Sequence, residues 1–131
     1  MIVRNDVLTG LTVLIVEDEY LIATDLQRVV EDAGAERVLL ARSTASAVGF
    51  LHASHRIDAC ILDLKLGDED GRPLAQELLK RGIPFVVATG MGVDVDLDLA
   101  DLVMVQKPYS DAQVVEALNL ARRSRETPSK A

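Results

Sequence analysis

The sequence is poor in cysteine, in aromatic residues and in positive charge, and each shortage excludes a class of protein. Cys60 is the single cysteine in 131 residues, which excludes an internal disulfide and a cysteine-rich zinc site. Two Tyr, two Phe and no Trp leave little material for stacking on bases. A formal net charge of -7 opposes binding to phosphate backbones. We therefore expect no nucleic-acid partner.

Long apolar runs are also missing. No stretch approaches the roughly 20 apolar residues that a membrane span requires. The first ten residues contain Arg4, Asn5 and Asp6, where a signal peptide would have its hydrophobic segment. We therefore expect no membrane partner and a cytoplasmic location. Cys60 lies within a short apolar run and is expected to be an inert core thiol.

Short apolar runs alternate with segments of helical periodicity along most of the chain. This alternation predicts an α/β fold: a doubly wound, five-stranded parallel sheet of flavodoxin-like order 2-1-3-4-5, with helices on both faces. The expected strands are Leu11–Val16, Arg37–Ala41, Ala59–Leu62, Pro84–Ala88 and Leu102–Val105. The expected helices are Tyr20–Ala33, a helix capped by Ser43 or Thr44 that ends at Leu51, Pro73–Arg81 before Gly82, and a helix from the capping box Ser110/Gln113 to Ala121.

The remaining segments define the domain organisation. Thr89 to Asp101 alternates apolar and acidic residues with a strand period, yet it occupies a crossover position, so we expect a short or irregular helix there. The length fits one domain, and we place it at residues 11–123, with an N-terminal extension at 1–10 and a flexible tail at 124–131.

Polar residues follow several predicted strands where each strand ends. Glu17 and Asp18 follow the first strand, Asp63 follows the third, Thr89 ends the fourth, and Lys107 follows the fifth. Each has an ordinary alternative explanation: the acids as turn or helix-cap residues, Thr89 as a turn residue and Lys107 as a solvated loop lysine. The predicted sheet order nevertheless brings all five to one edge, where ligands bind in open α/β sheets.

Three carboxylates close together repel one another, so their joint ionisation favours a bound cation. With Lys107 the set carries a formal charge of -2. Oxygen ligands without His or Cys favour Mg²⁺, with Mn²⁺ as a second choice. Such a site could accept a phosphoryl group on one carboxylate, while Thr89 and Lys107 bind phosphate oxygens.

This five-point pattern, over residues 11–123, resembles the receiver domain of two-component response regulators. The resemblance implies that Asp63 accepts a phosphoryl group from a sensor histidine kinase or a phosphotransfer protein. It also implies that Glu17, Asp18, Asp63 and the backbone carbonyl of Lys65 bind the metal. Thr89 and Lys107 would report phosphorylation, and the Lys107-Pro108 bond would be cis.

Two features depart from the usual receiver pattern. Met104 stands where receivers commonly have an aromatic switch residue, and the spacing from Thr89 to Lys107 is short. These features and the segment Pro84-Phe-Val-Val-Ala-Thr-Gly90 resemble the FATGUY subclass of stand-alone receivers, although Val87 and Met91 differ from its pattern. The resemblance implies signalling to a downstream protein partner through the fifth strand and its flanking segments, including Tyr109 and the 94–101 loop.

Other functions fit the sequence less well. A haloacid-dehalogenase phosphatase needs an acid where Lys65 stands, and an EF-hand would begin at Leu66. Gly90-Met-Gly92 lacks the third glycine of a dinucleotide site, and His52 and His55 have no other ligand nearby in the sequence. The main alternative is a receiver-like interaction module that binds its partner without phosphorylation.

Overall fold

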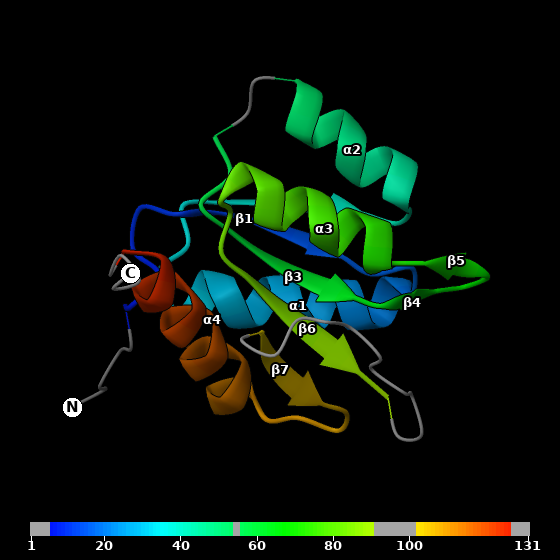
Figure 1. The fold of residues 1–131 in the computed structure, drawn as a ribbon. Coiled ribbons are helices and arrows are strands. Elements are labelled where there is room, and N and C mark those ends of the chain that lie inside the picture. Colours follow the sequence, from blue (N-terminus) through cyan, green and yellow to red (C-terminus); the bar gives the residue numbers. More distant parts are fainter. Residues whose placement is uncertain (1–5, 54–55, 91–101, 127–131) are drawn as a thin grey trace.

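The computed structural model describes residues 6–53, 56–90 and 102–126, and it shows a central sheet with helices on both faces (Figure 1). The elements, in chain order, are β1 (Thr12–Val16), α1 (Tyr20–Asp32), β2 (Arg37–Ala41), α2 (Thr44–His52), β3 (Ala59–Asp63), β4 (Lys65–Leu66), β5 (Glu69–Asp70), α3 (Arg72–Arg81), β6 (Phe85–Thr89), β7 (Val103–Gln106) and α4 (Asp111–Glu126). Within the described residues, no helix is both long enough and apolar enough to cross a membrane.

The sheet order is β2-β1-β3-β6-β7, and every neighbouring pair is parallel. This is the predicted flavodoxin-like order, so the fold prediction is confirmed. Figure 1 shows α2 and α3 on one face and α1 and α4 on the other. Helix α1 connects the parallel neighbours β1 and β2, whereas α4 follows the last strand, β7.

The apolar strands arise because both faces of the sheet are covered. Val13 and Ile15 of β1 belong to the core under α1 and α4, whereas Leu14 and Val16 belong to the core under α2 and α3. All five residues of β1, β3 and β6 are buried. A continuous apolar run therefore supplies both cores, because successive side chains of a strand point to opposite faces.

The helix boundaries follow local hydrogen bonding. The Ser43 hydroxyl accepts from the Ser46 N–H at 3.1 Å and caps α2, which decides between the two predicted caps. The predicted capping box of α4 is confirmed: the Ser110 N–H donates to the Gln113 side chain at 2.7 Å, and the Gln113 N–H donates to the Ser110 hydroxyl at 3.1 Å. Gly82 ends α3 in the left-handed conformation.

Three details differ from the sequence prediction or extend it. The predicted loop before α3 contains a short antiparallel hairpin, β4–β5, because Leu66 is buried in the core and Gly67 turns the chain at φ 59°. Helix α4 continues past Ala121 to Glu126. Leu8, in the predicted N-terminal extension, is fully buried, and its N–H donates to the Ala33 carbonyl at 3.0 Å.

Two predicted segments fall outside the described residues. The expected irregular helix lies mostly in 91–101, and the end of the expected tail lies in 127–131. Both stay predictions.

Candidate phosphoacceptor and metal site

The predicted acidic residues come together at the carboxyl end of the sheet. Oxygen atoms of Glu17, Asp18 and Asp63 all lie within 4.8 Å of one another. Glu17 and Asp18 directly follow β1, and Asp63 is the last residue of β3. The two strands are direct neighbours, with Val16 paired to Leu62, and this register brings the acids side by side.

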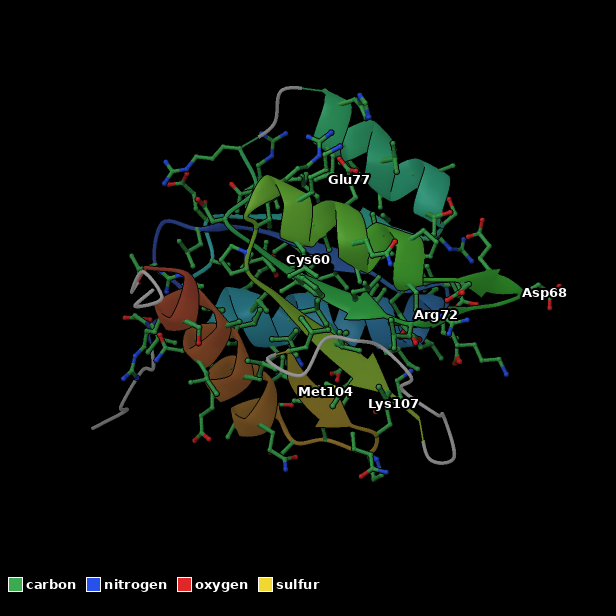
Figure 2. All side chains as sticks on the ribbon, viewed as in Figure 1. Cys60, Asp68, Arg72, Glu77, Met104 and Lys107 are labelled. Atoms are coloured by element: carbon green, nitrogen blue, oxygen red, sulfur yellow. The ribbon has the colours of Figure 1, made fainter. Side chains whose placement is uncertain are left out.

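Lys107 completes the cluster from the end of β7, the edge strand of the sheet. Its ammonium Nζ lies 3.1 Å from Asp63 Oδ2 and 3.5 Å from Glu17 Oε1. Figure 2 shows Lys107 beyond the end of β7, at the same end of the sheet as the hairpin that carries Asp68. One lysine thus contacts two buried carboxylates and offsets part of the cost of burying them.

Both oxygens of the Asp63 carboxylate have a partner. Oδ1 accepts the Lys65 N–H at 3.0 Å, and Oδ2 accepts from Lys107. The residue is 7% exposed. These two hydrogen bonds therefore fix the orientation of the Asp63 carboxylate.

Glu17 is the most deeply buried acid of the cluster, at 1% exposure. Its Oε2 accepts the Glu19 N–H at 3.1 Å. Burial raises the pKa of Glu17 to about 7; the nearby Asp63 adds to the rise, while the Glu19 N–H and Lys107 oppose it. The single ammonium does not compensate for the buried negative charge, so the site has room for another cation.

Lys107 is held in its charged form by the same neighbours. Partial burial by itself lowers the pKa of the ammonium, but the hydrogen bond to Asp63 and the charges of Asp63 and Glu17 outweigh it. The pKa of Lys107 is consequently raised above its ordinary value.

Thr89 and Lys107 are linked through the main chain. The Lys107 N–H donates to the Thr89 carbonyl at 2.7 Å. Ala88, the residue before Thr89, is the partner of Asp63 in the β3–β6 register. Thr89 is 9% exposed, and the Lys107-Pro108 bond is cis, as the sequence predicted. The two expected phosphate-reporting residues therefore end neighbouring strands beside Asp63.

The donor atoms suit a hard divalent cation. Three carboxylates within reach of one point offer oxygen ligands, and their charge exceeds that of Lys107 by two. Mg²⁺ prefers this donor type and keeps several waters of its own. The residues present thus fit Mg²⁺. Lys65 is the first residue of β4, and its N–H donates to Asp63 Oδ1 at 3.0 Å, so its main chain lies beside the cluster.

Sequence reasoning missed the residues that shape the hairpin next to the site. A Cβ on Gly71 would lie 3.0 Å from the Asp63 carbonyl oxygen and from two Leu64 backbone atoms. A Cβ on Gly67 would lie 3.4 Å from Asp18 Oδ2. The Gly67-Asp68 pair between two short runs is a hairpin signal that could have identified this turn.

Comparison with known proteins agrees with this geometry. The family model described as "Response regulator receiver domain" matches residues 13–119. The transcriptional regulatory protein PdtaR of Mycobacterium tuberculosis is 35% identical over 114 residues, which cover 83% of this chain and 55% of PdtaR. The chain thus spans about half the length of the curated relatives it matches.

Solved structures give the same result. SdrG from Sphingomonas melonis Fr1 is 38% identical with a TM-score of 0.72, and the match covers 88% of this chain and 97% of that chain. A response regulator receiver protein from Sinorhizobium medicae is 25% identical with a TM-score of 0.74, covering 88% and 96%. The chain belongs to the response regulator receiver domain family, the signalling domains of two-component systems.

Proposed function

We propose that this chain accepts a phosphoryl group on Asp63 from a phosphohistidine of a sensor histidine kinase or phosphotransfer protein. The observation that carries the proposal is the contact of one ammonium, Lys107, with Asp63 inside a cluster of three carboxylates. A cluster with only a structural role would not need three carboxylates beside a single ammonium, because unpaired buried charge is costly.

The transfer forms one bond and breaks another. A carboxylate oxygen of Asp63 attacks phosphorus, the phosphorus–nitrogen bond of the phosphohistidine breaks, and the electron pair returns to the imidazole nitrogen. The product is an acyl phosphate on Asp63. Lys107, already 3.1 Å from Oδ2, would pair with an oxygen of the phosphoryl group, and the Thr89 hydroxyl would donate to another.

Glu17, Asp18, Asp63 and the Lys65 carbonyl would hold the metal. When bound, Mg²⁺ would supply positive charge that offsets the negative charge of the transferring phosphoryl group. We also propose slow self-catalysed dephosphorylation: water would attack phosphorus, the bond from phosphorus to the Asp63 oxygen would break, and inorganic phosphate would leave while the Asp63 carboxylate is regenerated. Mn²⁺ would occupy the site with the same oxygen ligands.

Intact-mass measurement after incubation with acetyl phosphate and Mg²⁺ tests the proposal. We expect one added phosphoryl group that Asp63→Asn and removal of the metal both abolish. Asp32→Asn is the matched control, because its carboxylate is exposed on α1, and it should keep the adduct. A wild-type protein that forms no adduct would contradict the proposal and favour an interaction module that binds its partner without phosphorylation.

We further propose that the signal leaves through β7 and its flanking segments to a downstream protein partner. Met104 on β7 is 50% exposed, and half-buried Tyr109 packs against the core formed with α1 and α4. The hydrogen bond from Lys107 to the Thr89 carbonyl connects this edge of the sheet with the phosphoacceptor site. Amide exchange of Val103–Gln106 should slow on phosphorylation. Unchanged exchange would exclude this surface.

Membership of the FATGUY subclass is part of the proposal. It rests on the Pro84 to Gly90 segment and on Met104 in place of an aromatic switch residue. Signalling as a stand-alone receiver would follow from it. The phosphorylation-dependent amide exchange of β7 should be the same in Met104→Tyr as in wild type, which would support a switch that needs no aromatic residue. A response that appears in Met104→Tyr but not in wild type would contradict it.

A further inference from the structure

The β4–β5 hairpin covers one side of the acidic site and has little pairing of its own. Only Lys65 pairs with Asp70 and Leu66 with Glu69. A two-stranded ribbon this short is not stable by itself in water. Its position must therefore be set by contacts with the rest of the domain.

Three contacts fix the inner part of the hairpin. The Lys65 N–H donates to Asp63 Oδ1 at 3.0 Å, and Leu66 is 2% exposed in the core under α2 and α3. The Gly71 N–H donates to the Leu64 carbonyl at 2.7 Å. The carboxyl end of β5 is also held, because Asp70 Oδ1 accepts the Arg72 N–H at 3.0 Å and Asp70 Oδ2 pairs with the Arg72 guanidinium at 2.8 Å. None of these polar contacts joins the hairpin to helix α2.

The outer strand is attached to helix α2 through Glu69. Glu69 Oε1 accepts the Thr44 N–H at 3.1 Å, and Oε2 accepts the Thr44 hydroxyl at 3.1 Å. Thr44 is the first residue of α2, where backbone N–H groups lack helical partners and the helix dipole favours an anion. The Ser43 hydroxyl accepts the Ser46 N–H, and Glu69 accepts the Thr44 N–H of the same turn.

This contact bears on the metal site because both depend on the same short hairpin. Lys65 begins the hairpin and Gly67 forms its turn beside Asp18, with a Cβ position 3.4 Å from Asp18 Oδ2. Movement of β5 away from α2 would shift β4 through their shared hydrogen bonds. The Lys65 main chain would then lose its fixed distance from the acids.

We propose that Glu69 is a positioning residue for the metal site: by holding β5 on the N-terminus of α2, it fixes the Lys65 main chain beside the three carboxylates. The inference rests on the proposed function, since it assumes that this cluster binds Mg²⁺. Glu69 itself touches neither the acids nor the phosphoryl group.

Thermodynamic linkage adds a second consequence. If the contact between Glu69 and α2 raises the affinity for Mg²⁺, then Mg²⁺ must stabilise that contact by the same free energy. The start of α2 is therefore expected to respond to metal that it does not touch.

The test is an NMR titration of the unphosphorylated protein with Mg²⁺, following the amide signals of the site and of Thr44. Glu69→Ala should weaken Mg²⁺ binding by about fivefold or more, the lower end of typical coupling between sites. Glu69→Gln should bind within about twofold of wild type, because the amide keeps hydrogen bonds to Thr44 while losing the charge. The Thr44 amide should shift with Mg²⁺ in wild type and not in Glu69→Ala.

Controls separate this role from charge and from folding. Glu36→Ala removes an exposed carboxylate before β2, at the opposite end of the sheet, and should bind Mg²⁺ like wild type. Thr44→Val removes the hydroxyl that donates to Glu69. Its effect on Mg²⁺ binding should not add to that of Glu69→Ala, because both variants disrupt the same contact. Equal weakening by the glutamine and alanine variants, or unchanged binding by Glu69→Ala, would overturn the inference.

A parallel acetyl phosphate assay distinguishes this inference from the proposed function. Wild-type protein that binds Mg²⁺ but forms no adduct would refute the function and leave the role of Glu69 measurable. Wild-type protein that forms the adduct while Glu69→Ala binds Mg²⁺ normally would refute only the inference.

Discussion

Replacing Glu17 with glutamine should stabilise the metal-free protein, and the gain should depend on pH in a defined direction. The pKa of Glu17 rises from 4.5 to about 7 on folding, mainly because the carboxyl is buried. At 1.36 kcal/mol for each pKa unit, ionising this group in the folded protein costs about 3 kcal/mol. A glutamine side chain cannot ionise, so the variant avoids this cost.

The sign follows from proton linkage. Below the unfolded pKa, Glu17 is protonated in both states and costs nothing. Between that value and about 7, the folded protein keeps a proton that the unfolded chain releases, so stability falls as the pH rises. Above the folded pKa the full cost applies. The stability of Glu17→Gln relative to wild type should therefore increase by about 3 kcal/mol between about pH 4.5 and pH 8.

Urea unfolding followed by circular dichroism, with EDTA present, measures this difference. Glu116→Gln is the control, because it makes the same change at an exposed position on α4, away from the buried cluster. A fixed Mg²⁺ concentration of about 100 times the dissociation constant measured above pH 7 should stabilise wild type by about 2.7 kcal/mol there, and by less below pH 7, where Glu17 keeps its proton. A difference between Glu17→Gln and wild type that stays constant or shrinks as the pH rises would refute the reasoning.

Three further predictions concern packing. Gly71→Ala should destabilise the protein by about 1–3 kcal/mol in urea unfolding, since its Cβ meets only backbone atoms at 3.0 Å, whereas Gly49→Ala in open space within α2 should stabilise it by up to about 1 kcal/mol. Leu8→Ala should cost about 2–4 kcal/mol, while Val7→Ala, at a side chain 37% exposed, should cost under about 1 kcal/mol; equal losses would contradict the burial of Leu8. Burial raises the pKa of Cys60 far above its usual range, so a thiol reagent should modify it only after unfolding, and rapid labelling of the native protein would contradict this.

The strand order and the acidic cluster could be predicted because each depends on a strong local signal. The run Thr12–Val16 is apolar at every position but the first, which indicates a strand covered on both faces, and acids follow it directly. Once the order of the parallel strands is known, Asp63 and Lys107 must both lie at the carboxyl end of the sheet. Their contact at 3.1 Å follows from topology more than from any property of the two residues.

The parts that the sequence did not predict depend on contacts between distant segments. Leu8 belongs to no periodic pattern in the sequence, and its buried position depends on the core that it shares with α1 and α4 and on the bond from its N–H to the Ala33 carbonyl. Nothing in the sequence distinguishes Glu69 from other acidic loop residues, and its role depends on the fold, which places Thr44 of α2 beside it. Two residues in each strand of a hairpin are too few for an alternation pattern to be recognised.

The contacts of Val7 and Leu8 at the amino end of the sheet have a practical consequence for reporters. Leu8 is buried there, and the Arg122 guanidinium of α4 donates to the Val7 carbonyl at 3.3 Å. Val7 and the end of α4 therefore lie together, away from the end of the sheet where Figure 2 labels Lys107. A fluorescent protein joined before residue 6 or after residue 126 would start from that side. Either fusion would leave the end of the sheet with the acidic cluster open, whereas a chain that starts at residue 11 would lack the buried side chain of Leu8.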